Sequence, residues 1–188
     1  MTAAQADLAQ PTANSTEMTG EPMLDVPEVA DGAHLWRIAR DSGTLDLNSS
    51  YSYLLWCRDF AATSVVARGA DGLPVAFVTG YVRPDAPDTL LVWQVAVDAA
   101  HRGRGLAGRL LDTLSDRVAA THGIRRLETT VTPDNTASDR LFTSFAERRG
   151  ALLSREVLFA GEQFPGPDGG HEPEVLYAIE PLTAPAAS

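Results

Sequence analysis

The segment from Val92 to Leu114, VWQVAVDAAHRGRGLAGRLLDTL, joins an apolar run of strand type to a helical pattern through a loop of arginines and glycines. Within it, Arg102-Gly103-Arg104-Gly105-Leu106-Ala107 fits the pattern [Q/R]-x-x-G-x-[G/A] at a helix start. Backbone N–H groups at a helix N-terminus point toward a bound anion, glycines allow its close approach, and arginines add positive charge. The loop therefore predicts a site for a pyrophosphate.

The same glycines also spell a second pattern. Gly103, Gly105 and Gly108 read G-x-G-x-x-G, and Glu128 follows about 20 residues later, as in dinucleotide-binding folds. In those folds the first glycine follows its strand almost at once within a parallel βαβ unit. Here the five residues DAAHR intervene, and the preceding strands read as hairpin-linked. The context argues against a nicotinamide fold.

Composition narrows the class of protein. The 188 residues are 44% apolar and 21% charged, a balance typical of one globular domain, and no apolar stretch is long enough to span a bilayer. A net charge of -10 disfavours a nucleic-acid partner held by a broad basic surface. The single Cys57 excludes an internal disulfide, and the N-terminus lacks the basic and apolar regions of a secretion signal. We therefore expect a cytoplasmic protein without a membrane or nucleic-acid partner.

Hydrophobic periodicity predicts a mixed α/β order without internal repeats. Helical spacing predicts helices over 31–43, 49–60, 105–122 and 137–150. Period-two patterns predict strands over 22–26, 64–68, 74–83, 89–97, 125–132, 151–159 and 174–180. In the second helix, Tyr51, Leu54 and Leu55 are expected to share one face, with Asn48 or Ser49 as the cap.

With its strand, loop and helix, the Arg102–Ala107 motif resembles the GNAT superfamily of N-acetyltransferases. The resemblance implies an α/β GNAT acyl-CoA N-acyltransferase fold, with a mixed, mostly antiparallel central sheet flanked by helices. It also implies a domain over 21–183, followed by a C-terminal tail at 184–188. Residues 1–20 are rich in Ala, Thr, Gln, Ser and Pro and have no apolar period, so they are expected to form a disordered tail. The cofactor implied is acetyl-CoA, without a metal. The contacts implied for it are the backbone of Val95, Ala96 and Val97 on a splayed strand, and the loop residues Arg102, Gly103, Arg104, Gly105, Leu106, Ala107 and Gly108.

A second motif of that superfamily occurs in TPDNTASDRLF. Asn135 matches an asparagine on the helix that lines the thiol end of the cofactor, although an asparagine there also serves as a helix N-cap. Seven residues later, Phe142 occupies the position where members commonly carry a tyrosine that protonates the leaving thiolate. The resemblance implies that both residues contact the cofactor, and that another group or water supplies the proton.

The segments DSGTLDLNSSYSYLLWCRDF, DTLLVWQVAV, VTPDNTAS and FPGPDGGHEPEVLY resemble the L-2,4-diaminobutyrate acetyltransferases of the ectoine pathway, and the likeness runs from about Pro22 to Leu182. This resemblance implies a homodimeric enzyme that acetylates the 4-amino group of L-2,4-diaminobutyrate. A later enzyme cyclises that product to the compatible solute ectoine, which serves under osmotic stress.

Several residues suit a substrate with two ammonium groups and one carboxylate. Asp46 can accept from an ammonium group, or be a turn former. Asn48, Ser49 and the start of the second helix can cradle the carboxylate. Trp93 is expected to share a strand face with Leu91, Val95 and Val97, either packed in the core or as a wall of the substrate site.

The chemistry needs a base, because an alkyl amine with a pKa near about 10 arrives protonated. Glu174 and His171, three residues apart in a turn-rich loop, can relay that proton or be solvated loop residues. Tyr51 can protonate the departing thiolate, or pack in the core. Cys57 as an acetylated intermediate is less favoured than direct attack, because its neighbours are mainly apolar. Scattered histidines without paired spacing argue against a zinc site.

Two other functions stay open. The chain can be a GNAT-fold enzyme for another small amine, or a non-catalytic acyl-CoA-binding protein, for which Phe142 at the tyrosine position leaves room.

Overall fold

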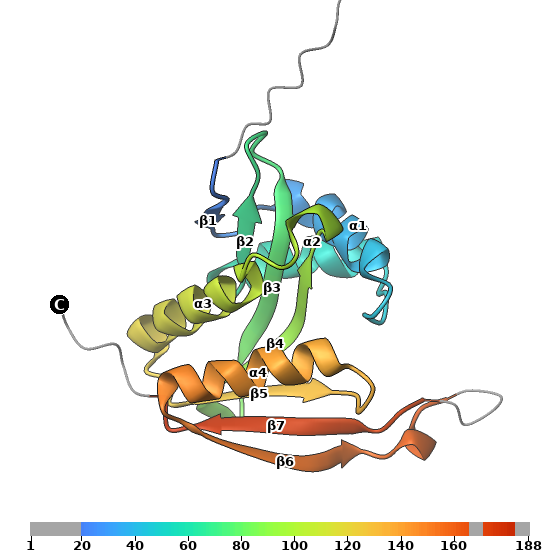
Figure 1. Ribbon diagram of the computed structural model, residues 1–188, viewed down its shortest axis with the longest axis vertical. Helices are drawn as coiled ribbons and strands as arrows, with labels where there is room; N and C mark the ends of the chain where they lie inside the picture. The colour runs from blue at the N-terminus through green and yellow to red at the C-terminus, as the bar shows by residue number, and fades with distance from the viewer. Residues whose placement is uncertain (1–19, 166–170, 183–188) are drawn as a thin grey trace, which may run out of the picture.

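The computed structural model describes residues 20–165 and 171–182 (Figure 1). The strands are β1 Met23–Asp25, β2 Val65–Arg68, β3 Pro74–Arg83, β4 Ala86–Val97, β5 Arg126–Val131, β6 Leu152–Phe159 and β7 Glu174–Glu180. The helices are α1 Gly32–Ser42, α2 Ser50–Asp59, α3 Leu106–His122 and α4 Thr136–Arg149. Each of these strands and helices overlaps a range predicted from hydrophobic periodicity. The predicted tails fall outside the described residues, apart from residue 20.

The strands form one sheet in the order β1-β2-β3-β4-β5-β7-β6. All neighbouring pairs are antiparallel except β4 and β5, which are parallel. The predicted mixed, mostly antiparallel sheet is therefore confirmed. One apolar core lies between the sheet and the helices α3 and α4, and a second lies on the face covered by α1 and α2.

The parallel pair is short. Along the described strands, β4 and β5 pair only from Thr89 with Arg126 to Leu91 with Glu128. The rest of β4, up to Val97, continues alongside β3. The two strands therefore diverge after Leu91, and the sheet opens toward the C-terminal end of β4.

A β-bulge at Trp93 changes the facing of β4. Thr79 pairs with Gln94 but Gly80 pairs with Val92, so Trp93 is an extra residue on this strand. Before the bulge, Val92 packs in the core under α3 and α4. After the bulge, the odd-numbered residues Val95 and Val97 pack against this core instead. Sequence alternation alone cannot show this inversion.

The bulge corrects the predicted environment of Trp93. Val95 and Val97 pack against the core under α3 and α4. Trp93 instead stacks on Trp56 of α2, with ring centroids 4.5 Å apart. Trp93 therefore does not share a face with Val95 and Val97, because the extra residue breaks the period of two.

The buried face of α2 also differs from the expectation. Tyr53 and Cys57, one turn apart, are 0% and 3% exposed. Tyr51 and Leu54 are 65% and 39% exposed instead. Apolar residues surround this helix on several sides, so periodicity alone did not identify the face that meets the sheet.

Glycines end the helices as predicted. Gly43 and Gly150 follow α1 and α4 with φ of 67° and 61°, a left-handed conformation that glycine adopts without a steric penalty. Within the described residues, we find no helix with the length and apolar character needed to cross a bilayer.

Candidate active site

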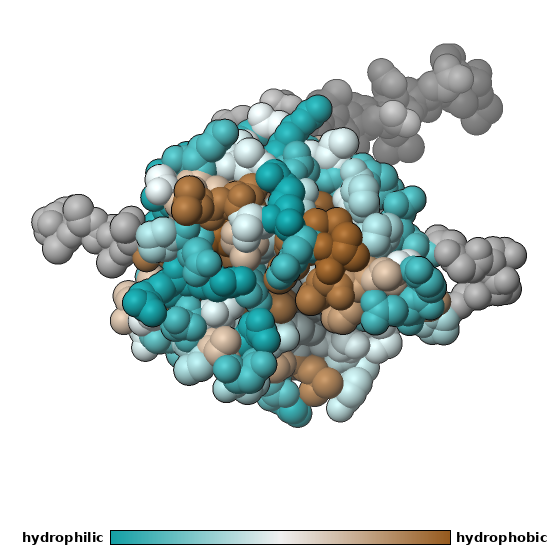
Figure 2. Space-filling view, turned by 90° about the horizontal axis from the view of Figure 1, so that it is seen from below, coloured by the Kyte–Doolittle hydropathy of each residue, from teal (hydrophilic) through white to brown (hydrophobic). Residues whose placement is uncertain are grey.

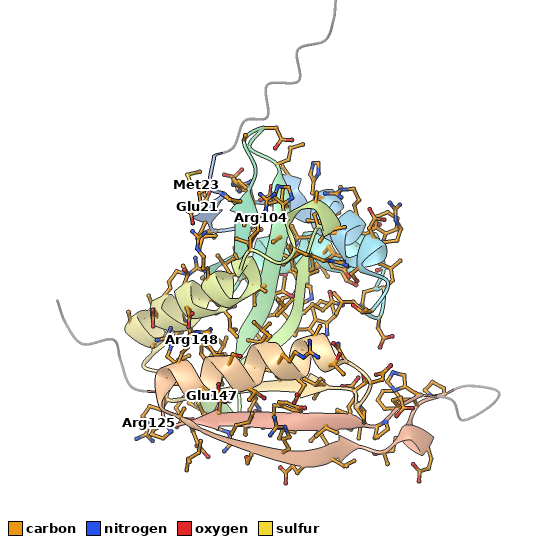
Figure 3. All side chains as sticks on the ribbon, in the orientation of Figure 1. Glu21, Met23, Arg104, Arg125, Glu147 and Arg148 are labelled. Carbon is orange, nitrogen blue, oxygen red and sulfur yellow. The ribbon has the colours of Figure 1, made fainter. Side chains whose placement is uncertain are left out.

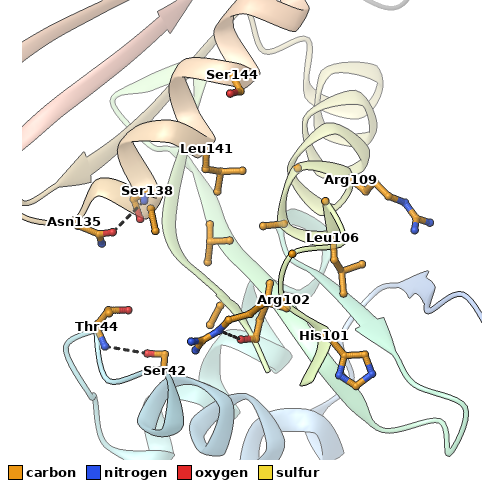
Figure 4. A pocket seen from close by; sticks show the side chains of 18 of the residues that line it. Ser42, Thr44, His101, Arg102, Leu106, Arg109, Asn135, Ser138, Leu141 and Ser144 are labelled. Carbon is orange, nitrogen blue, oxygen red and sulfur yellow. Dashed lines mark hydrogen bonds between the residues drawn. The ribbon is translucent and has the colours of Figure 1, made fainter. Parts of the chain in front are cut away.

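A cavity of about 750 Å³ lies where β4 has separated from β5 (Figure 4). Its walls come from the end of α1 and the loop after it, the end of β4, the loop into α3 with the first turns of that helix, and α4. Most of the residues predicted to bind the cofactor line this space: Val95, Ala96, Val97, Arg102, Gly103, Gly105, Leu106, Ala107, Gly108 and Asn135.

The loop into α3 presents backbone donors to the cavity. Gly103 and Gly105 both have positive φ, at 76° and 70°, where a side chain would be strained. Gly105 is the N-cap of α3, and its carbonyl accepts the first helical bond from Arg109. No described side chain caps the N–H groups of the first turn. These groups and the helix dipole favour an anion at this place.

Arg102 and Arg104 lie differently although both belong to the motif. Arg102 lines the cavity, and its Nε donates to the carbonyl oxygen of Val97 at 3.0 Å. Arg104 is exposed and does not belong to the cavity wall (Figure 3). The expected contact of Arg104 with the cofactor stays a prediction, because its side chain is exposed and not among those that line the cavity.

Asn135 caps α4, since its Oδ1 accepts from the N–H of Ser138 at 3.0 Å, and it also lines the cavity. Its two predicted roles are compatible in this geometry. Phe142 is 2% exposed and packs in the core under α3 and α4. The neighbouring Leu141 lines the cavity instead. Successive helical residues point about 100° apart, so Phe142 and Leu141 face different surroundings. The expected cofactor contact of Phe142 is therefore corrected.

Two further arginines line the cavity that the motif did not suggest. Arg109 pairs with Glu21, and in Figure 4 its side chain points away from the interior. Arg148 of α4 lies between α3 and α4 in Figure 3 and contacts Asp112 at 3.1 Å. Packing of α4 against α3 brings Arg148 to the cavity, so its sequence position gave no signal. Ser42, Thr44 and Leu45 at and just after the end of α1, and His101 before the loop, were also missed, because only the tertiary structure brings them to the cavity.

The predicted substrate residues from distant segments meet in one group. His171 Nε2 lies 3.5 Å from Oδ2 of Asp46, and polar atoms of both side chains and of Glu174 all lie within 4.8 Å of one another. The Asp46 side chain is 85% exposed, and that of His171 is 27% exposed. Asp46 directly follows Leu45, which lines the cavity. This group therefore lies near one end of the cavity and offers two carboxylates to cationic ligands.

His171 is held in place and carries a shifted pKa. Its ring stacks on Phe164, with ring centroids 3.9 Å apart. The contact of Nδ1 with the backbone oxygen of Glu172 raises the pKa of His171, and the carboxylates of Asp46 and Glu174 raise it further. All three acceptors stabilise the imidazolium form. His171 therefore stays protonated to a higher pH than an ordinary histidine.

The start of α2 faces solvent near Asp46. Ser49 is the N-cap and its hydroxyl lies 3.1 Å from that of Ser52, while Asn48 Nδ2 donates to the Asp46 carbonyl at 3.3 Å. Tyr51, in the first turn, is exposed, so its predicted core alternative is wrong and its hydroxyl is accessible. In this first turn the N–H of Ser52 already donates to the carbonyl oxygen of Ser49 at 3.0 Å, which leaves the N–H groups of the two residues between them able to bind a carboxylate.

Trp93 lies on the α2 side of the sheet. Its ring stacks on Trp56, at an interplanar angle of 16°, and lies 6.3 Å from that of Tyr53. Gln94, the next residue, contacts the Asp46 backbone. Trp93 is thus both packed against α2 and on the side of the Asp46 segment.

Cys57 is 3% exposed, and burial raises the pKa of its thiol to about 11. A thiol with such a pKa carries almost no thiolate at neutral pH. The structure thus agrees with Cys57 as a packing residue.

The sequence matches the family model described as Acetyltransferase (GNAT) family over residues 33–146. The L-2,4-diaminobutyric acid acetyltransferase of Streptomyces coelicolor is 68% identical over 98% of this chain and 99% of its own length. That of Marinococcus halophilus is 43% identical over 89% of this chain and 98% of its own length.

Solved structures agree with these relatives. The diaminobutyrate acetyltransferase EctA from Paenibacillus lautus, in complex with its substrate L-2,4-diaminobutyric acid and coenzyme A, is 40% identical and superposes with a TM-score of 0.81. The match covers 89% of this chain and 99% of that one. The acetyltransferase yncA from Salmonella typhimurium, with acetyl-CoA, is 18% identical with a TM-score of 0.66, over 90% of this chain and 98% of that one, and shows the shared fold. The chain belongs to the GNAT family of acetyltransferases and, within it, to the L-2,4-diaminobutyric acid acetyltransferases.

Proposed function

We propose that this protein transfers the acetyl group of acetyl-CoA to the 4-amino group of L-2,4-diaminobutyrate. The observation that carries the proposal is the convergence of Asp46, His171 and Glu174 beside the cavity at the splayed end of β4. The relatives named for this activity and the related structure with both ligands support it.

The elements around the cavity predict the direction in which acetyl-CoA lies, with its pyrophosphate at α3 and its thioester toward Asp46. The N–H groups at the start of α3 bind the pyrophosphate, and the backbone of Val95 and Val97 bonds the amides of the pantetheine arm. Because β5 has left this part of β4, an acyl chain can lie alongside the strand. The thioester then reaches the region of Asp46, which follows the cavity residue Leu45.

The diamine fits the neighbouring group. The carboxylates of Asp46 and Glu174 bind ammonium groups, and the start of α2 with Asn48 and Ser49 binds the carboxylate of the substrate. Trp93 forms an apolar and aromatic wall beside the cations. Two acceptors for two ammonium groups favour this diamine over a monoamine.

The reaction proceeds by direct attack. The 4-ammonium loses a proton to Glu174, or to His171 when its imidazole is neutral, and the amine nitrogen forms a bond to the thioester carbon. The C–S bond then breaks, the acylated nitrogen loses its second proton to water, and the thiolate receives a proton from Tyr51, which regains one from solvent, or directly from water. The buried thiol of Cys57, with its raised pKa, does not favour a covalent route.

The cellular location, the metabolic role and the oligomeric state are also part of the proposal. The enzyme works in the cytoplasm, supplies the product from which ectoine is formed under osmotic stress, and needs no metal. It forms a homodimer. In support of the dimer, β6 is an edge strand with large apolar side chains exposed, namely Leu152, Val157, Leu158 and Phe159. Figure 2, seen from the side of β6 and β7, shows apolar patches separated by hydrophilic side chains.

Measurement of free thiol release with acetyl-CoA and a panel of amines tests the function. We expect diaminobutyrate to be turned over far faster than polyamines, aminoglycosides or monoamines, with the acetyl group on the 4-nitrogen by NMR. Faster turnover of another amine would assign the enzyme to that substrate. Binding of acetyl-CoA without turnover of any amine would indicate a non-catalytic acyl-CoA-binding protein.

The dimer is tested by light scattering on the purified protein, with Val157→Asp as the variant. Twice the chain mass for the natural sequence, and a shift toward one chain mass for the variant, are the expected results. A natural protein of one chain mass would exclude the homodimer.

A further inference from the structure

Gln94 joins α2 to the segment that carries Asp46. Its amide is buried, with the residue 5% exposed. The hydroxyl of Tyr53 donates to Gln94 Oε1 at 3.0 Å, and Gln94 Nε2 donates to the backbone oxygen of Asp46 at 3.0 Å. A backbone carbonyl only accepts, so the amide orientation is determined by its partners. Both polar ends of Gln94 are therefore satisfied inside the protein.

We propose that Gln94 is a positioning residue for the diamine, which acts through Asp46. By holding the Asp46 backbone, Gln94 places the Asp46 carboxylate beside His171 and Glu174. The proposal rests on the proposed function, in which Asp46 binds an ammonium group of the substrate.

The exposure of Asp46 makes a backbone anchor important. With 85% of its side chain exposed, packing restricts the carboxylate little, and its contact with His171 is long at 3.5 Å. Asn48 Nδ2 donates to the same backbone oxygen from the surface at 3.3 Å. The bond from Gln94 is shorter at 3.0 Å and partly buried, and its donor belongs to a buried side chain, so it restrains this carbonyl more strongly than the exposed bond from Asn48.

The bulge at Trp93 makes this contact geometrically available. Ala96, two residues further on, packs in the core beneath α1 and α2 together with Tyr53, which places Gln94 on the same face. Without the extra residue, the period of two would send Gln94 toward α3. The bulge therefore links the strand that borders the cofactor cavity to the segment that binds the amine.

The main test is Gln94→Met, which keeps length and apolar volume but removes both hydrogen bonds. We expect the KM for diaminobutyrate to rise about tenfold, while the KM for acetyl-CoA stays within about twofold. Tyr53→Phe is a milder variant for Gln94, because it keeps the Nε2 bond to Asp46 and frees only the Oε1 end of the amide. It should raise the KM for diaminobutyrate about two- to threefold, and it serves if the Met variant does not fold.

Thr63→Val is the matched control. Thr63 is also buried and donates to a backbone oxygen, that of Gly80 at 2.6 Å, but none of its described hydrogen bonds reaches the segment of Asp46. We expect this variant to lower the melting temperature without changing the ratio of the two KM values. The same pattern in Gln94→Met would show a merely structural role and overturn the proposal.

A double-mutant cycle with Asp46→Asn tests the path of the effect. If Gln94 acts through Asp46, Gln94→Met should add less than about twofold to the KM for diaminobutyrate in the Asp46→Asn background. Additive effects would overturn the inference. If Asp46→Asn alone leaves that KM unchanged, the proposed amine site fails instead, and the two failures are distinguishable.

Discussion

The imidazole Nε2 of His171 lies 3.5 Å from the carboxylate Oδ2 of Asp46, although 125 residues separate them in the chain. The contact joins the loop before α2 to the segment before β7. Glu174 completes the group, so two acids face the same small space. This arrangement leads to specific expectations for variants and for pH.

Asp46→Asn and Glu174→Gln should each lower kcat/KM for diaminobutyrate about ten- to a hundredfold. Each removes one charge-assisted contact of roughly 1.5–3 kcal/mol while preserving shape and hydrogen-bonding capacity. The KM for acetyl-CoA, measured in the same assay, should barely change. If both variants act on diaminobutyrate with natural efficiency, the two acids are only a turn former and a solvated loop residue.

The pH dependence of kcat/KM for diaminobutyrate should reflect the titration of His171. Its raised pKa means that kcat/KM for diaminobutyrate falls as the pH decreases through a value above 6.5, because the imidazolium form repels the ammonium groups and cannot accept a proton. In His171→Gln this fall of kcat/KM should disappear, and kcat/KM should fall only at lower pH, where groups of lower pKa are protonated. The titration of the substrate amines is common to both proteins, so their difference isolates His171. Superimposable profiles would exclude this role.

Arg102→Glu should raise the KM for acetyl-CoA at least about tenfold and that for the amine much less, because it places a like charge beside the pyrophosphate. Arg104→Glu is the matched control, two residues away in the same loop but outside the cavity wall. It should have a clearly smaller effect. Equal effects of both variants would show that only the overall charge of the loop matters, and an unchanged KM for Arg102→Glu would refute the pyrophosphate assignment.

Cys57→Ala should retain turnover, because direct transfer does not use the thiol. Loss of a buried atom should lower the free energy of unfolding by about 1 kcal/mol, observed as a lower melting temperature. The natural protein should also react slowly with thiol reagents, since its thiol is buried with a pKa of about 11. Complete loss of activity in a folded variant would indicate a covalent intermediate.

Phe142→Tyr should not create a proton donor. The ring is 2% exposed in the core, so the added hydroxyl costs about 1–3 kcal/mol unless it finds a partner, and it does not face the cavity. We expect a melting temperature several degrees lower and a kcat that does not increase. An increased kcat with unchanged stability would show that this side chain reaches the thiol end.

Local signals in the sequence were enough to predict the elements and the glycine loop that leads into α3. The helix over 105–122 needs only apolar residues at a regular spacing, and the stops at Gly43 and Gly150 need only the freedom of glycine at positive φ. Gly103 and Gly105 likewise adopt the conformation that their loop requires. Such features depend on a few neighbouring residues, so the sequence displays them directly.

The tertiary structure alone decided which way the side chains point and which segments meet. One extra residue at Trp93 inverts the facing of the strand after it, and the buried face of α2 is that of Tyr53 rather than Tyr51. Phe142 faces the core because α4 docks on the sheet through that side. Asp46 and His171 come together only because β5, β7 and the loop before β7 lie beyond the splayed end of β4. The sequence determined the elements and the conformation of the glycine loop before α3 because short-range periodicity and backbone freedom specify them, whereas register, helix docking and long-range contacts depend on packing across the whole sheet.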